Sequence, residues 1–309
     1  PHGANIVNMA YENGLYVQVG ERGQIFTSED LPNWIPRDSH TTVALRAVTF
    51  FNGQIVITGE NGTVLVADDP AYFFRSALGT TDWLEGVAAS SNLVVAVGDN
   101  AAIYISTNAL NWSRIVPPFN DWLRCVAYGA DTFVAVGENG LIATSLNGQN
   151  WQARASGTTA HLNRVAWMGD HFFAVGDGGA TLASPDGISW QPAAIGSVTN
   201  SLYAASAGSG SLLVAGDLEV WANDDGWSNQ LTDPEPLPAP AWTYYSALWD
   251  DARYLLAGRS GMIVEGIKTN SADSFRWVPE SDSIRTWLWQ VARFPDYYLA
   301  VGDRGTVLS

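Results

Sequence analysis

Residues 122–156 read WLRCVAYGADTFVAVGENGLIATSLNGQNWQARAS, and this stretch decides the fold. It contains four short runs rich in Val, Ile, Phe, Tyr and Trp, at 122–128, 132–137, 141–145 and 150–156. Such runs are typical of β-strands, and the Gly, Asn and Asp between them are typical of tight turns. No segment of the chain keeps a helical spacing of apolar residues over three turns. The stretch therefore predicts four antiparallel strands joined by hairpins.

The second run ends in the phrase FVAVG, and related phrases recur along the whole chain. Each consists of apolar residues followed by Gly, and successive copies lie 39 to 44 residues apart. The eight copies are YVQVG (16–20), IVITG (55–59), VVAVG (94–98), FVAVG (133–137), FFAVG (172–176), LLVAG (212–216), YLLAG (254–258) and YLAVG (298–302). This period is that of a four-stranded blade. The sequence predicts an all-β, single-domain β-propeller whose strands a to d run outwards from a central channel.

The predicted blades follow directly from the repeat. They span approximately residues 5–42, 43–81, 82–120, 121–159, 160–200, 201–242, 243–283 and 284–309. The last is incomplete, because the sequence stops at Ser309 after a third strand. The N-terminus is too short to supply the missing strand, since the first predicted strand begins at Asn5. Eight blades is the preferred interpretation, and seven blades plus an overhang is the alternative.

The hairpins carry recurring turn residues. Between strands b and c most repeats have Gly-acid-x-Gly, as in 137–140, and we expect these glycines to adopt positive φ angles. Between strands c and d comes Ser-x-(Asn/Asp), followed by Trp, as in 145–151 and 184–190. Asn147 and Asp186 are expected to close their own turns by side-chain hydrogen bonds, and the Trp to pack as a wedge between blades.

These turns resemble a known motif. The Ser-x-Asp-Gly-x-x-Trp turn looks like a shortened Asp-box, the structural hairpin of sialidase-type propellers. The unit HLNRVAW…HFFAVGDGG…SPDGISW (161–190) resembles repeats of the photosystem II assembly-factor family and related bacterial exported propellers. The resemblance covers essentially the entire chain. It implies the fold, a periplasmic or extracellular location, and ligand binding on the face that carries the b–c hairpins and the d–a connections.

Composition and charge limit the classes of molecule that the chain is expected to bind. The net charge is −16, from 31 acidic and 15 basic residues, and such a surface repels phosphate backbones, so nucleic acid is not expected. No apolar run approaches the roughly 18 to 20 residues of a membrane helix. The four histidines show no ligand spacing, and no phosphate or dinucleotide loop is present, so no metal or cofactor is predicted. A start at Pro1 fits a processed, exported product.

One candidate feature is a ring of carboxylates on the b–c hairpins. Its members are Glu21, Glu60, Asp99, Glu138, Asp177, Asp217 and Asp303, with Arg259 in the remaining blade. A rim of like charges would attract cations or a basic partner. The alternative is that an acid in a Gly-rich turn is ordinary solvated hairpin chemistry. One acid per blade spreads the oxygens too widely for calcium.

A second candidate is the start of strand a. Its first position holds Trp83, Trp122, His161 and Trp287. The residues two positions further on are Arg46, Glu85, Arg124, Asn163, Tyr203, Tyr245 and Trp289. Aromatic and polar side chains around a rim can stack on sugars and bind hydroxyls, or anchor a protein partner. The alternative is that these tryptophans are structural wedges between blades.

No catalytic constellation follows from the sequence. A sialidase needs an early Arg-Ile-Pro element, whereas Ile35-Pro36-Arg37 has a different order in an outer strand. A polysaccharide lyase needs a base near a cation, and His161 with Arg124 is the one pairing to test. The leading hypothesis is a non-enzymatic, exported propeller that binds a protein as a scaffold or assembly factor. The alternative is a carbohydrate-binding propeller, a lectin or a lyase, that uses the aromatic rim.

Overall fold

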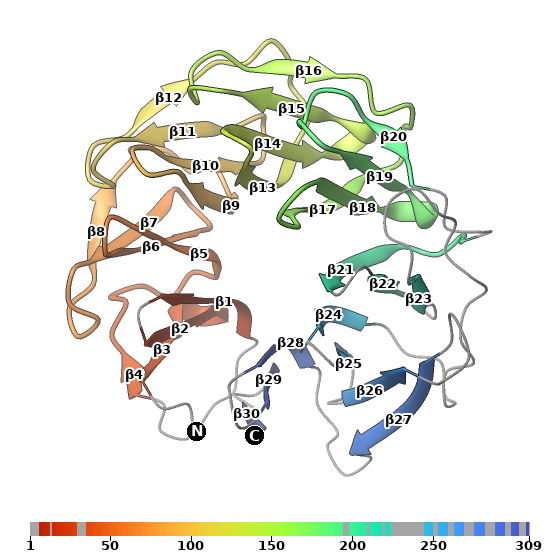
Figure 1. Cartoon of the computed structure of the whole chain (residues 1–309). Coiled ribbons are helices and arrows are strands. Elements are labelled where there is room, and N and C mark those ends of the chain that lie inside the picture. Colours follow the sequence, from red (N-terminus) through yellow and green to blue (C-terminus); the bar gives the residue numbers. More distant parts are fainter. Residues whose placement is uncertain are drawn as a thin grey trace.

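The computed structural model describes the first five repeats almost continuously and the later repeats in separate segments. The described residues are 6–12, 14–29, 35–193, 198–208, 211–217, 220–223, 244–249, 253–258, 263–268, 275–281, 288–293, 298–302 and 307–308. Their strands form eight antiparallel sheets arranged in a ring (Figure 1). The all-β propeller fold predicted from the repeats is confirmed. Within these segments, no helix is long and apolar enough to cross a bilayer.

The first four sheets have four strands each, in chain order. The first contains β1 (Ile6–Glu12), β2 (Leu15–Gly20), β3 (Ile25–Ser28) and β4 (Ile35–Arg37). The second contains β5 (Leu45–Phe51), β6 (Gln54–Gly59), β7 (Thr63–Ala67) and β8 (Phe74–Ala77). The third contains β9 (Leu84–Ala89), β10 (Val94–Gly98), β11 (Ile103–Ser106) and β12 (Ser113–Ile115). The fourth contains β13 (Leu123–Gly129), β14 (Thr132–Gly137), β15 (Ile142–Ser145) and β16 (Gln152–Arg154).

The remaining sheets follow the same order in their described strands. The fifth contains β17 (Leu162–Trp167), β18 (Phe172–Gly176), β19 (Thr181–Ser184) and β20 (Gln191–Pro192). The sixth contains β21 (Leu202–Gly208), β22 (Ser211–Gly216) and β23 (Val220–Asn223). The seventh contains β24 (Tyr244–Trp249), β25 (Arg253–Gly258), β26 (Ile263–Lys268) and β27 (Phe275–Ser281). The eighth contains β28 (Leu288–Arg293), β29 (Tyr298–Gly302) and β30 (Val307–Leu308).

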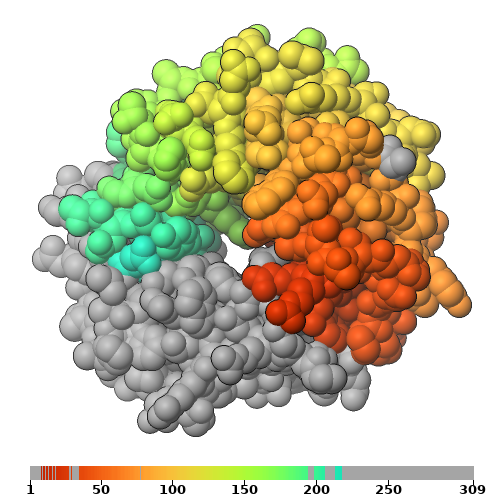
Figure 2. Space-filling model, turned by 180° about the vertical axis from the view of Figure 1, so that it is seen from behind, coloured from red at the N-terminus to blue at the C-terminus, as the bar shows by residue number. Residues whose placement is uncertain are grey.

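The first strand of each sheet is innermost. Consecutive first strands contact one another, as β5 does β9 and β9 does β13, and β1 contacts β28 to close the ring. Seen from behind, the described blades border a central hollow (Figure 2). The N-terminal strand β1 belongs to its own four-stranded sheet rather than completing the last one. Among the b–c hairpins that the structure describes in full, three contain a short 3-10 turn: η1 (Glu21–Gly23), η2 (Glu138–Gly140) and η3 (Asp177–Gly179).

The repeated phrase lies in strand b, where both faces are covered by neighbouring sheets. Every residue of β10 and β14 is buried. Alternate residues of β10 enter different layers: Val95 and Val97 pack towards the fourth sheet, whereas Val94 and Ala96 pack towards the second. Each buried Val contributes about 1.5–3 kcal/mol, as an upper bound. Continuous apolar runs are therefore needed here instead of a polar–apolar alternation.

The glycine that ends the phrase is explained differently from what the sequence predicts. Gly137 has φ −171°, which is extended, and Gly176 likewise has φ −163°, so positive φ is the wrong reason for this position. Instead, a Cβ on Gly137 would overlap the carbonyl oxygen of Trp122. Trp122 is the residue before β13, which is strand a of the same sheet. Positive φ occurs further into the turn, at Asn139 (53°) and Gly140 (71°). Only the second glycine of the hairpin follows the expectation.

The c–d turns close as predicted. In the fifth sheet the Asp186 carboxylate accepts hydrogen bonds from the backbone N–H of Ile188 and of Ser189, at 2.8 and 3.0 Å. The Trp190 Nε1–H donates to the Gly187 carbonyl, and its indole packs in the buried layer between the fourth and fifth sheets. The Trp of this motif is thus an inter-blade wedge.

The Asp186 turn should make stability depend on pH. The hydrogen bond from Ser189 N–H, supported by those from Ile188 N–H and the Ser184 hydroxyl, lowers the pKa of Asp186, although burial opposes this. A lowered folded-state pKa contributes stability above the unfolded value near 3.8, and this contribution is lost as pH falls through the folded pKa. We expect Asp186→Asn to remove this dependence, an effect of roughly a few tenths of a kcal/mol at an exposed group. Urea unfolding at a series of pH values measures it.

The matched control is the reciprocal substitution in the fourth sheet, where Asn147 makes the same turn bonds without titrating. Asn147→Asp should introduce the acid-labile contribution that Asp186→Asn removes. Parallel stability–pH curves for Asp186→Asn and the wild-type chain would contradict this account.

Candidate functional site

A β-bulge at the start of strand a positions the candidate residues. In each of the eight sheets the pairing between strands a and b skips one residue of strand a. The skipped residues are Val7, Arg46, Glu85, Arg124, Asn163, Tyr203, Tyr245 and Trp289. A bulge re-aims a side chain that regular pleating would direct elsewhere. The second row of predicted rim residues is thus a row of bulged residues.

The bulged side chains bind the acids of the b–c hairpins. In four sheets each forms a hydrogen bond with the carboxylate 14 residues further along the chain. The pairs are Arg46–Glu60, Arg124–Glu138 at 3.4 Å, Asn163–Asp177 at 2.8 Å and Tyr203–Asp217 at 3.2 Å. The carboxylate ring is therefore neither a bare negative rim nor a set of simply solvated turns in these sheets. Asp303 and Arg259 lie outside the described residues.

The same side chains link neighbouring blades. The Arg124 Nη1–H donates to Asn163 Oδ1 at 2.6 Å, and Asn163 Nδ2–H donates to the Leu202 carbonyl at 3.2 Å. Glu85 lies 4.0 Å from Arg46 Nε. Burial raises the pKa of Glu85, and the charges of Arg46 and Arg124 oppose that rise. Polar contacts of the bulged residues thus link the second sheet to the third, and the fourth sheet through the fifth to the sixth.

Two tryptophans stand beside this network. Trp83 and Trp122 directly precede β9 and β13, and their rings meet edge to face with centroids 6.5 Å apart. Trp83 is 38% exposed, and the Arg46 guanidinium lies 5.7 Å from its ring centroid. The Trp83 backbone N–H donates to Asp99 Oδ1 at 2.7 Å. The structure therefore brings Arg46, Trp83 and Trp122 together, and these three residues are called the aromatic ledge.

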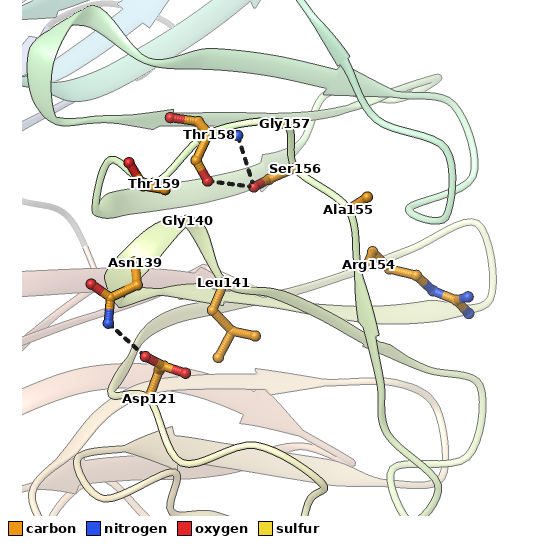
Figure 3. A pocket seen from close by; sticks show the side chains of 10 residues that line it. All are labelled: Asp121, Asn139, Gly140, Leu141, Arg154, Ala155, Ser156, Gly157, Thr158 and Thr159. Atoms are coloured by element: carbon orange, nitrogen blue, oxygen red, sulfur yellow. Dashed lines mark hydrogen bonds between the residues drawn. The ribbon is translucent and has the colours of Figure 1, made fainter.

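An open groove begins at Asp121, the residue that precedes Trp122 in the chain (Figure 3). It has a volume of about 680 Å³ and lies between the b–c hairpin of the fourth sheet and the connection to the fifth. Asp121 and Asn139 lie at one end, where Asn139 Nδ2–H donates to Asp121 Oδ1 at 2.6 Å. Arg154 lies at the other end, with its guanidinium directed away from Asp121. Sequence reasoning missed this groove, because the Asp-Trp pair that stands beside it in the fourth repeat also occurs in the third, where the Asp82 carboxylate meets Tyr104 and Arg114 instead.

The remaining residues predicted at the rim are His161, Tyr245, Trp287 and Trp289, and the structure describes them to different extents. His161 precedes β17, and its Nδ1 accepts the Asn139 backbone N–H at 3.0 Å. Arg124 bonds instead to Asn163 and Glu138, so the structure gives the proposed His161–Arg124 pair separate partners. Tyr245 and Trp289 occupy bulges in β24 and β28, where only the backbone is described, and Trp287 lies outside the described residues.

The comparisons agree with this architecture. The family model described as the DUF6242 beta propeller domain matches residues 143–272. A solved structure of YCF48 bound to D1 peptide has a TM-score of 0.64 at 17% identity, covering 99% of this chain and 91% of that chain. YCF48 from Cyanidioschyzon merolae has a TM-score of 0.63 at 16% identity, covering 83% and 93%. The computationally designed Ika8 protein has a TM-score of 0.80 at 14% identity, covering 99% and 96%.

No curated protein matches the chain. The family model covers fewer than half of the residues, and the solved structures are distant in sequence, so together they establish the fold. The resemblance read from the repeats is confirmed at the level of the fold: the chain is a β-propeller, similar in fold to the solved YCF48 structures.

Proposed function

We propose that this chain is an exported, non-enzymatic β-propeller that binds an extended segment of a protein partner, as a scaffold or assembly factor. The observation that carries the proposal is the exposed Trp83 ring, held against Trp122 and Arg46 beside an open groove. Large aromatic side chains with a neighbouring Arg are the residue types that dominate protein interfaces. The YCF48 structure solved with a D1 peptide supports peptide binding by a propeller of this kind. The exported location rests on the resemblance of the repeats, and cell fractionation tests it.

A displayed library of random peptides, selected on the wild-type chain, tests the binding proposal. We expect the enriched peptides to bind Trp83→Ala at least about tenfold more weakly, because that substitution removes the exposed anchor. Tyr72→Ala is the matched control, since Tyr72 is an aromatic residue 76% exposed on the c–d turn of the second sheet, on the opposite face. Its effect should stay within about twofold. Enriched peptides that bind Trp83→Ala as tightly as the wild type would count against the rim.

Carbohydrate binding is the second candidate function. It is favoured by one observation: an exposed indole lies near a groove lined by the Asp121 carboxylate, the Asn139 amide and the hydroxyls of Ser156 and Thr158. Such a combination can stack on a sugar ring and bind its hydroxyls. A glycan array with a Trp83→Ala control, which removes that exposed indole, separates the two functions. Sugar binding that the variant loses, together with an empty peptide selection, would replace the first proposal with this one.

A further inference from the structure

We infer that the groove beside Trp122 receives a basic side chain, an arginine or lysine, of the partner segment, with Asp121 as its counter-ion. This inference rests on the proposed peptide-binding function and names the chemistry of the partner. Its basis is a comparison of the charged side chains around Trp83 and Trp122: some have a partner of opposite charge within the chain, and Asp121 is bonded to an uncharged amide.

Arg46 of the ledge and Arg124, two residues after Trp122, already have acidic partners. Arg46 is paired with Glu60, and Arg124 with Glu138. Each therefore contributes little net positive charge to the open face. Around the tryptophans, Asp99 accepts the Trp83 backbone N–H, and Asp121 accepts an amide hydrogen of Asn139. Neither of these bonds brings a positive charge to a carboxylate.

A comparison within the chain shows what Asp121 lacks. Asp82 occupies the equivalent position 39 residues earlier, directly before Trp83. Its carboxylate accepts the Tyr104 hydroxyl at 2.8 Å and lies 3.8 Å from the Arg114 guanidinium. Tyr104 and Arg114 are paired across β11 and β12. The third sheet thus supplies both a hydroxyl and a cation to its own aspartate.

The fourth sheet supplies neither of these groups. The cross-strand pair equivalent to Tyr104 and Arg114 is Ala143 and Ala153. The base that lines the groove, Arg154, donates its Nε–H to Thr144 Oγ1 at 2.8 Å and points away from Asp121 (Figure 3). Asp121 is the one acid among the lining residues, and it adjoins an open volume of about 680 Å³. A partner's cation would therefore complete in the fourth blade what Arg114 does in the third.

The aromatic ledge fits the same ligand. The chain already places a guanidinium, that of Arg46, 5.7 Å from the Trp83 ring centroid. An indole binds a cation through its ring electrons, and this attraction adds to that of a nearby carboxylate. The chain's net charge of −16 would also attract a basic segment and hasten its encounter with the chain.

Labelled Gly/Ser peptides test the inference. One peptide carries arginine at alternate positions. The second peptide carries citrulline at the same positions, because citrulline has a similar shape without the charge. Fluorescence anisotropy should show that the arginine peptide binds more tightly, and that added salt weakens it. Asp121→Asn should weaken the arginine peptide about tenfold and leave the citrulline peptide unchanged. The asparagine oxygen can still accept the Asn139 hydrogen bond, so the variant removes the charge alone.

Asp170→Asn is the matched control. It removes the same charge from an exposed aspartate of the a–b turn in the fifth sheet, on the opposite face, and should change affinity by less than about twofold. Equal binding of the two peptides, an unchanged Asp121→Asn, or no binding of the arginine peptide overturns the inference. The proposed function has its own readout. If Trp83→Ala weakens binding of the library peptides and Asp121→Asn does not, peptide binding at the rim is supported and the inference of a basic segment is wrong. Binding of an oligosaccharide that the arginine peptide cannot displace also overturns it.

Discussion

Gly98→Ala should lower the free energy of unfolding by about 3 kcal/mol or more. Gly98 ends β10, and its φ does not lie in the left-handed region, so alanine could adopt the backbone conformation. A Cβ at this position would nevertheless overlap the carbonyl oxygen of Trp83. That oxygen accepts the Asp99 backbone N–H at 3.0 Å, and the Trp83 N–H is held by the Asp99 carboxylate. The strand cannot shift without breaking both bonds, and the bulge at Glu85 would be lost with them.

Urea unfolding followed by tryptophan fluorescence measures the loss. Gly53→Ala is the control, because Gly53 lies in the open a–b turn of the second sheet with φ 80° and nothing near its Cβ position. That substitution should cost about 1–2 kcal/mol, the penalty for placing an L-residue in the left-handed region. If Gly98→Ala proves the milder of the two, close approach is not the reason for the repeated glycine.

Most of the fold could be predicted because strand b is buried on both faces. In a run such as VVAVG every residue is apolar, so both faces of the strand must be covered by neighbouring sheets. The run also recurs with a nearly constant period, as the blades of a propeller do. The role of its glycine could not be predicted, since a sequence does not distinguish a residue chosen for positive φ from one chosen for lack of a Cβ. The third b–c hairpin illustrates the point. Ala101 adopts φ 51° there, where most other repeats have Gly.

The candidate site was predictable in position but not in its pairing. The row of residues Arg46, Glu85 and Arg124 follows from aligning the repeats, whereas the bulge that aims them depends on the register of strands a and b. One signal was available: the offset of 14 residues between each bulged residue and its hairpin acid is constant across seven repeats, in four of which the two side chains form a hydrogen bond. The groove at Asp121 could not be foreseen, because it depends on which way Arg154 points.

Trp151→Ala should lower the free energy of unfolding by about 3–5 kcal/mol. Trp151 is 4% exposed and packs in the apolar layer between the third and fourth sheets, beside Val95 and Ile105. Its Nε1–H donates to the Gly148 carbonyl at 2.7 Å, closing the c–d turn. Truncation would leave a cavity between two blades and an unpaired turn carbonyl. Urea unfolding again measures the loss.

Trp83→Ala separates the two uses that the chain makes of tryptophan. Because Trp83 is 38% exposed and stands at the rim, its truncation should cost less than about 1 kcal/mol of stability while it weakens binding of the partner. Trp151→Ala should do the reverse at temperatures where the variant stays folded. A stability loss for Trp83→Ala as large as that for Trp151→Ala would make the rim tryptophans structural wedges. The ledge would then exist to hold blades together, and the partner would have to bind elsewhere.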